Sequence, residues 1–192
     1  INDRIVVCTT DRSRITGHTL LAERATVNRF CEDSGKRMWA ATEKGIFVWK
    51  DDAPAGRLFA GCDVQDIIPL DGDRLLAAVS GRGIFTVSTR DFSSSSLYLQ
   101  PTDSMTAGAL RRPSCLLRRS DGSLWIGTRF DGVVRYDPRQ GFRSYTLHSG
   151  MASNEISDMT EDAIGNVWVS TSYGLSLISP AFEHVITYFQ SD

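Results

Sequence analysis

Residues able to carry catalytic chemistry are few in this sequence, and their spacing does not favour an active site. The three histidines, His18, His148 and His184, lie far apart, whereas metal sites usually draw their ligands at short spacings from one element. The sequence contains no GxSxG, HExxH or P-loop motif. We therefore expect no enzyme activity, no metal site and no cofactor.

The cysteines favour the same interpretation. They are spread along the chain as Cys8, Cys31, Cys62 and Cys115. None forms a CxxC pair, which disfavours a zinc site or a redox motif, and four in 192 residues are too few for a disulfide scaffold. We expect small buried thiols, while the disulfide state and the compartment stay open.

The composition excludes several classes of protein. The 21 basic and 23 acidic residues give a net charge of -2, so no excess of positive charge is available for a nucleic acid. Hydrophobic residues at 41% and charged residues at 23% are typical of a globular chain. The longest apolar run, residues 75–79, is far short of the roughly 20 residues of a membrane helix, so we expect no membrane contact. Because the sequence starts with Ile1, we expect a piece of a longer protein.

An internal repeat of about 40 residues dominates the sequence and must position any functional residue. Trp39, Trp125 and Trp168 occupy equivalent places in similar segments. Leu76 and Val6 take this place in two further copies. Because the tryptophans recur with the repeat, we interpret them as core packing between repeats, not as a ligand platform.

Further positions recur after the tryptophan in the aligned repeats, and we call each set of equivalent positions a column. Two residues later stands a small residue and then a β-branched one, which is typical of a strand that another sheet crosses closely. A glycine then opens an apolar run, which indicates a hairpin; these glycines are Gly45, Gly83, Gly132 and Gly174. With one strand upstream and one downstream, each unit has four antiparallel strands. The sequence therefore predicts an all-β fold made of β-propeller blades.

Two kinds of segment between the strands have simpler interpretations. Asp121, Glu161 and Asp162 are interpreted as turn carboxylates, because Asp and Glu lie at predicted hairpin tips and Asp bonds its own backbone there. The four serines at 93–96 are interpreted as a solvated loop insertion.

The repeats resemble a known family. Residues 156–175 (ISDMTEDAIGNVWVSTSYGL) and 121–136 (DGSLWIGTRFDGVVRY) resemble the two-component regulator propeller repeat, and the link from Phe142 and Tyr145 to residues 150–154 is similar to that of the family. The resemblance weakens at 27–50 and is degenerate at 64–87. It implies the periplasmic sensor of a Bacteroides-type hybrid histidine kinase and response regulator, an inner-membrane protein that responds to glycan-derived ligands and signals through dimer packing.

The repeat boundaries set the expected architecture. We place four complete blades and a partial one at about 1–22, 23–61, 62–100, 109–148 and 152–192. The family builds seven-bladed rings, so we expect a fragment of a larger propeller, as an open arc or, second, a small five-bladed ring. Exposed blade faces favour association, so we expect self-association as a homodimer.

A ligand site is expected where two sets of loops meet around the propeller axis. These are the hairpins between the second and third strands and the loops entering each first strand. Their polar and aromatic residues suit an oligosaccharide, and the arginines favour an acidic one. The candidates are Glu43, Lys44, Arg82, Arg129, Phe130, Asp131, Tyr173, His148 and Asn154.

Two other functions stay open. A propeller enzyme acting on glycans, a lyase or a glycosidase, would need paired carboxylates; residues 120–125 are faintly similar to the Asp-box of sialidase-like propellers but differ in spacing. The third hypothesis is an extracytoplasmic scaffold for protein interactions. For the hairpin at 129–131 two possibilities stay open, because Phe130 is either exposed for binding or folded into the core.

Overall fold

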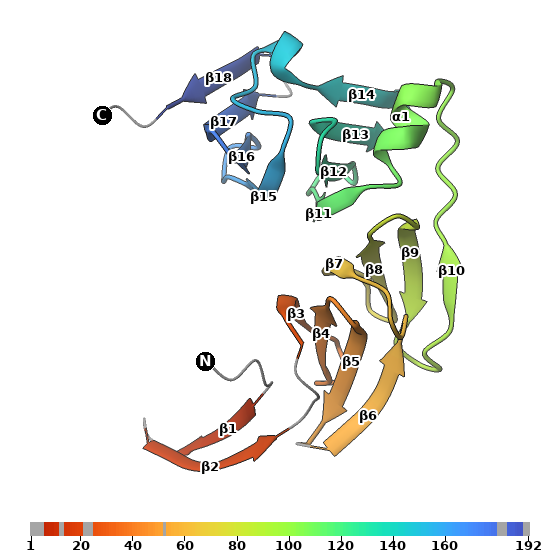
Figure 1. The fold of residues 1–192 in the computed structure, drawn as a ribbon, viewed down its shortest axis with the longest axis vertical. Helices are drawn as coiled ribbons and strands as arrows, with labels where there is room; N and C mark the ends of the chain where they lie inside the picture. The colour runs from red at the N-terminus through yellow and green to blue at the C-terminus, as the bar shows by residue number, and fades with distance from the viewer. Residues whose placement is uncertain (1–5, 12–13, 21–24, 52, 180–183, 190–192) are drawn as a thin grey trace. The chain divides into compact units, whose positions relative to one another are not determined.

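The computed structural model describes the backbone of residues 6–11, 14–20, 25–51, 53–179 and 184–189, and the side chains of these ranges from residue 25 onward. Strands make up nearly all of the regular structure, as the repeat predicts (Figure 1). Within the described ranges, a two-stranded sheet is followed along the chain by four four-stranded sheets.

The chain divides into two compact units. Unit 1 comprises Ile1–Ala77 and Thr86–Ser95, and unit 2 comprises Ala78–Phe85 and Ser96–Asp192. The division passes through the sheet of order β10-β9-β8-β7. Its strands are β7 (Val64–Asp71), β8 (Arg74–Val79), β9 (Gly83–Ser88) and β10 (Ser94–Ser96).

Unit 1 begins with an antiparallel pair and continues with a complete four-stranded sheet. The pair is β1 (Val6–Asp11) and β2 (Arg14–Leu20); the sheet contains β3 (Val27–Glu32), β4 (Met38–Thr42), β5 (Gly45–Lys50) and β6 (Ala53–Leu58), in that order. Strands β3 and β4 pack against β7. Trp39 is fully buried and meets the ring of Phe92 edge-on at 5.5 Å.

Unit 2 contains two complete sheets, each with its strands in chain order (Figure 1). The first contains β11 (Pro113–Arg118), β12 (Leu124–Thr128), β13 (Val133–Asp137) and β14 (Gly141–Tyr145). The second contains β15 (Ile156–Glu161), β16 (Val167–Thr171), β17 (Gly174–Ser179) and β18 (His184–Tyr188). Strands β11 and β12 contact β15, and one buried cluster joins Trp125, Tyr145, Ile156 and Val169 across the two sheets.

The repeated columns of the sequence explain this packing. Gly127, in the small-residue column, lies where the next sheet crosses: a Cβ on it would come within 2.7 Å of Ile156 Cγ2. Trp39 and Trp125 are fully buried, Leu76 is nearly so, and Trp168 is partly buried. The interpretation of the tryptophan column as core packing is therefore confirmed.

The long interval between repeats differs from the sequence prediction in two ways. The serine run was expected to be a loop, but Ser94–Ser96 form β10, an exposed strand held beside β9 through its backbone. The sequence also gave no sign of the short helix α1 (Ser104–Ala109), whose first turn is capped by Asp103 accepting from the N–H of Thr106 at 2.7 Å. Both elements lack the apolar periodicity on which the repeat was recognised.

Candidate ligand-binding surface

The hairpin between β12 and β13 is fixed by its threonine and its glycine. The Thr128 hydroxyl donates to the carbonyl oxygen of Gly132 (2.7 Å) and accepts from the N–H of Asp131 (2.9 Å). Gly132 has a φ of +77°, and a Cβ there would overlap the carbonyl oxygen of Tyr145. The next hairpin of unit 2 has the same threonine-to-glycine hydrogen bond. The threonine column thus has a second role, holding the turn through its hydroxyl, which the sequence reading missed.

This hairpin lies between the segments that enter the first strands of both sheets. The N–H of Arg129 donates to the carbonyl oxygen of Arg112, just before β11, at 3.2 Å. The N–H of Gly132 donates to the carbonyl oxygen of Asn154, just before β15, at 2.9 Å. The two sets of loops expected to carry a ligand site therefore meet at one end of unit 2. We call this end, formed by residues 112, 129–131, 147–148, 154 and 172–173, the turn surface.

Phe130 is exposed on the turn surface. The residue is 57% accessible, and the Arg112 guanidinium lies 5.7 Å from the ring centroid. The same guanidinium makes an ion pair with Asp131 at 3.1 Å. Phe130 is therefore not part of the core, and Arg112 holds the hairpin in place on two sides. Sequence reading missed Arg112 because it lies outside the recurring columns.

Asn154 links the turn surface to the segment after β14. Its side-chain oxygen accepts from the N–H of Leu147 at 2.8 Å, at the start of the short helix η1 (Leu147–Ser149). Leu147 is 54% accessible, and the neighbouring His148 is exposed. An exposed leucine was not predicted, and it adds a second apolar side chain to this end of the unit.

Tyr173 adds a third exposed apolar group from the hairpin between β16 and β17. The N–H of Ser172 donates to the carbonyl oxygen of Glu155 at 3.2 Å, and its hydroxyl lies 3.0 Å from that of Ser153. The hairpin is thereby tied to the segment that carries Asn154, while Tyr173 is 76% accessible. Phe130, Leu147 and Tyr173 therefore come from three loops that hydrogen bonds join.

The remaining predicted residues lie elsewhere. Arg82 is in the turn between β8 and β9, with its guanidinium 5.4 Å from the centroid of the Phe85 ring, and it lines a hollow beside α1. Glu43 and Lys44 form the hairpin between β4 and β5 in unit 1. The role of all nine residues in ligand binding stays a prediction.

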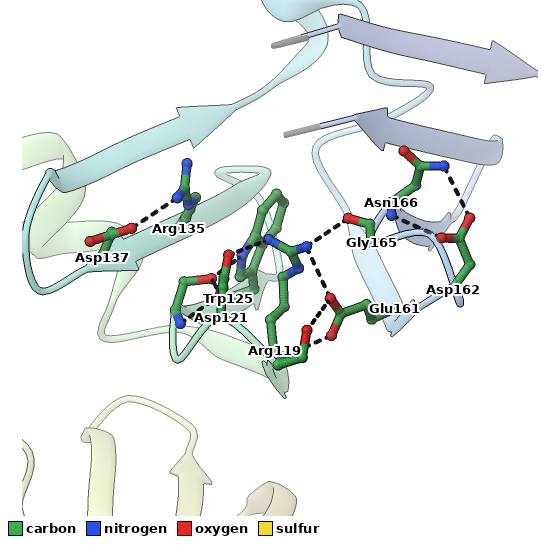
Figure 2. Close-up of polar contacts among 11 residues, drawn as sticks. Arg119, Asp121, Trp125, Arg135, Asp137, Glu161, Asp162, Gly165 and Asn166 are labelled. Carbon is green, nitrogen blue, oxygen red and sulfur yellow. Dashed lines mark hydrogen bonds and ion pairs between the residues drawn. The ribbon is translucent and has the colours of Figure 1, made fainter. Parts of the chain in front are cut away.

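The opposite end of unit 2 contains a network of charged residues joining its two sheets (Figure 2). Arg119 is 8% accessible and contacts Glu161 at 2.9 Å, Asp121 at 2.6 Å and the carbonyl oxygen of Gly165 at 2.6 Å. Glu161 also accepts from the N–H and the hydroxyl of Ser120, both at 2.9 Å. We call Arg119, Ser120, Asp121 and Glu161 the clasp.

The clasp corrects one interpretation and confirms another. Asp121 accepts from the N–H of Ser123 at 2.8 Å, as a turn residue does. Glu161 is not a turn carboxylate, because its partners lie on the preceding sheet. Burial raises the pKa of Glu161, but the hydrogen bonds from Ser120 and the charge of Arg119 outweigh it and hold that pKa below its ordinary value.

The turn carboxylates also hold the tryptophan column. Asp33 accepts the indole N–H of Trp39 at 2.9 Å, and Asp162 accepts that of Trp168 at 3.1 Å. Asp162 also accepts from the N–H groups of its own turn, as predicted. In the repeat that contains β11–β14, Arg119 stands at the equivalent position and contacts the other clasp residues instead. There the Trp125 indole donates to Ser123 at 3.0 Å.

The groups on the turn surface suit ligand binding. Exposed rings beside guanidinium and carboxylate groups provide stacking and paired hydrogen bonds. Among the described side chains, no three His, Cys, Asp or Glu residues gather as metal ligands. No helix within the described ranges is long and apolar enough to cross a bilayer.

Comparison with known families and curated proteins identifies the repeat. The two-component regulator propeller model matches residues 150–173, which run from the end of η1 through β15 and β16 into the following hairpin. The resemblance drawn from the sequence is therefore confirmed for this repeat. No curated protein matches the chain.

Comparison with solved structures identifies the fold. The chain is similar to the extracellular domain assigned to the hybrid two-component system BT3049 of B. thetaiotaomicron, with 21% identity and a TM-score of 0.69 over 91% of this chain and 25% of that one. It is also similar to the extracellular domain assigned to the one-component system BT4673 of the same organism, with 18% identity and a TM-score of 0.70 over 90% and 23%. The WD40 β-propeller domain of Doa1 matches with 14% identity and a TM-score of 0.54 over 88% and 50%. The fold is a β-propeller fold of four-stranded blades, as predicted, and the chain spans about a quarter of the first two proteins.

Proposed function

Because residues 150–173 are a two-component regulator propeller repeat, we propose that this chain is part of the extracytoplasmic sensor of a two-component signalling protein. The extracellular domains to which its fold is similar support this assignment. On this proposal the chain is periplasmic, it recognises a ligand, and the signal passes to a histidine kinase elsewhere in the protein. It has no catalytic role of its own.

We place the ligand on the turn surface. The observation that carries this is the exposure of Phe130, Leu147 and Tyr173 on three loops joined by hydrogen bonds, with Arg112 and Arg129 beside them. Exposed apolar groups that a fold holds in place are typical of interaction sites. Ring faces beside guanidinium groups suit a sugar, whose C–H faces stack while its hydroxyls and acids pair. The ligand is therefore proposed to be glycan-derived.

The test uses a fluorescently labelled chain on an array of neutral and acidic oligosaccharides. Binding of the parent chain should be lost in the double variant Arg129→Ala with Phe130→Ala and weakened in Tyr173→Ala. Folding should be unaffected, because truncating so exposed a side chain costs less than about 1 kcal/mol. Binding that survives both variants would place the ligand elsewhere. Binding of proteins without any saccharide would favour the scaffold, and turnover of a glycan by the chain would favour the enzyme.

Signalling through dimer packing needs a surface for a second copy. Trp168 stands where Trp39 and Trp125 are fully buried, yet it is only partly buried, and it stacks on Tyr188, which is 47% accessible. Ile186 on the same strand β18 is 41% accessible. We place the self-association surface on this sheet. Sedimentation should show dimers at micromolar concentration that Tyr188→Ala weakens; a monomer at this concentration would exclude this surface.

A further inference from the structure

The hollow of unit 2 beside α1 differs in chemistry from the turn surface. It has a volume of about 420 Å³, within the range of small-molecule sites. Arg82 and Arg111 line it, together with Ile84, Leu110 and Tyr98, and Tyr98 is 79% accessible. No acidic residue stands among the described residues that line it. In a chain with a net charge of -2, such a hollow is a local concentration of positive charge.

Backbone contacts hold the walls of the hollow together. Gly83, with a φ of +94°, packs so closely that a Cβ on it would lie 3.3 Å from the carbonyl oxygen of Leu110, at the end of α1. The N–H of Leu97 donates to the carbonyl oxygen of Ile84 at 2.8 Å. The turn that carries Arg82 and the helix end that precedes Arg111 are thus held together by close packing. The backbone positions from which the two arginine side chains extend are therefore fixed relative to each other.

A neighbouring groove of unit 2 provides a contrast. It shares Tyr98 but is lined by Asp103 and Asp137, with no arginine or lysine among its described lining residues. The hollow beside α1 and the neighbouring groove both offer ring faces, but only the hollow offers cations. An acid is therefore favoured in the hollow and disfavoured in the groove.

We propose that the hollow beside α1 is a subsite for the acidic group of a sugar. Arg82 and Arg111 bind its carboxylate or sulfate through charge-assisted hydrogen bonds, and the sugar ring packs on Tyr98 and Ile84. The subsite rests on the proposed function only in taking a sugar as the ligand. It goes beyond that function in assigning Arg82, Arg111 and α1 to the acid, away from the turn surface.

The test is a two-dimensional ¹⁵N NMR titration of the 192-residue chain with glucuronate, glucose 6-sulfate, glucose and inorganic sulfate. Both sugar acids should move the resonances of residues 82–84, 97–99 and 107–111. Arg82→Ala and Arg111→Ala should each lower the affinity for them about tenfold, as the loss of a charged hydrogen bond predicts. Arg139→Ala removes an equal charge from the exposed hairpin between β13 and β14, at the clasp end of the unit, and should leave the affinity unchanged.

Each other result overturns a defined part of the proposal. Equal binding of glucose would show that the arginines do not select an acid. Equal binding of inorganic sulfate would show that the sugar ring adds no affinity. Equal binding to the double variant Arg82→Ala with Arg111→Ala would exclude the site. Shifts confined to residues 129–131 and 172–173 would exclude the subsite but support ligand binding on the turn surface. Shifts confined to the hollow would support the subsite and count against ligand binding on the turn surface.

Discussion

Replacing Glu161 with alanine should loosen the two sheets of unit 2 from each other. The substitution removes one carboxylate and three contacts from the clasp, one with Arg119 and two with Ser120. The Glu161 side chain is 17% accessible and that of Arg119 is 8% accessible, so water shields their interaction less than on an open surface. The lost contacts link β11–β14 with β15–β18, and their loss acts on the interface between the sheets.

The size of the effect follows from what remains. Removing one partner of a fully buried ion pair costs about 3–5 kcal/mol. Arg119 still keeps Asp121 and the carbonyl oxygen of Gly165, each at 2.6 Å, so its charge is not left alone. Ser120 is exposed and regains hydrogen bonds from water. We therefore expect a loss of about 2 kcal/mol in the free energy of unfolding, and about 1 kcal/mol for Glu161→Gln, which keeps the shape and an acceptor.

Urea unfolding followed by tryptophan fluorescence measures these losses. An unchanged m-value, the slope of the unfolding free energy against urea concentration, shows that the folded state is otherwise intact. Glu155→Ala is the matched control, because Glu155 is exposed and its contacts with Ser172 and Ser153 are made by its backbone. It should change stability by less than about 0.5 kcal/mol. If Glu161→Ala is as stable as this control, the clasp contributes no net stability and behaves as surface ion pairs often do.

The pH dependence provides an independent check of the same reasoning. The pKa of Glu161 is lower in the folded chain than its ordinary value of 4.5, so the unfolded chain binds more protons between the two values. The stability that Glu161 provides is therefore complete above pH 4.5 and is lost as the pH falls through the folded pKa. The difference in unfolding free energy between the parent chain and Glu161→Gln should shrink below pH 4.5. A difference that stays constant down to acidic pH would contradict the assignment.

Three further predictions concern the repeat. Gly132→Ala should lower the free energy of unfolding by more than about 2 kcal/mol, because its Cβ would overlap the carbonyl oxygen of Tyr145. Gly141→Ala, also at positive φ but with open space around it, should lower it by about 1 kcal/mol, and equal Tm values for the two variants would contradict the close approach. Asp33→Ala should cost about 3 kcal/mol by leaving the Trp39 indole N–H and two turn N–H groups without their acceptor, and a loss below 1 kcal/mol in urea unfolding would refute this role. Burial raises the pKa of Cys31 to about 11, so iodoacetamide at pH 8 should label the half-buried Cys62 well before Cys31 or Cys115, as mass spectrometry of the folded chain can show; early labelling of Cys31 would contradict its burial.

The sequence was sufficient for those parts of the fold in which each repeat solves the same packing problem. The tryptophan and small-residue columns recur because every blade must fill the same space against its neighbour, so their spacing predicted the strands of both units. Strand β10 and helix α1 do not share that problem. β10 is exposed and pairs through its backbone, which no side-chain pattern reports, and the six residues of α1 are too few to display a period.

The candidate site divides in the same way. The position of the hairpin at 129–131 was predicted because the columns on either side define the turn, whereas the sequence left the exposure of Phe130 open. Arg112 and Leu147 were missed because they lie in segments of variable length between repeats. Glu161 was assigned to its own turn because its partner Ser120 is 41 residues away, and contacts of that range depend on how blades pack.

The variation between repeats has a physical consequence for how blades choose their neighbours. The apolar columns are similar from repeat to repeat, so apolar packing distinguishes one blade from another only weakly. The polar bridges distinguish them: in unit 1 Arg29 of β3 pairs with the buried Asp66 of β7 at 2.9 Å, and in unit 2 Arg119 pairs with Glu161, from different positions of the repeat. Exchanging one blade for another would preserve most apolar contacts but leave the buried Asp66 or the partly buried Glu161 without its arginine, at a cost of about 2 kcal/mol or more. The bridges therefore specify the order of blades on a core that is common to all of them.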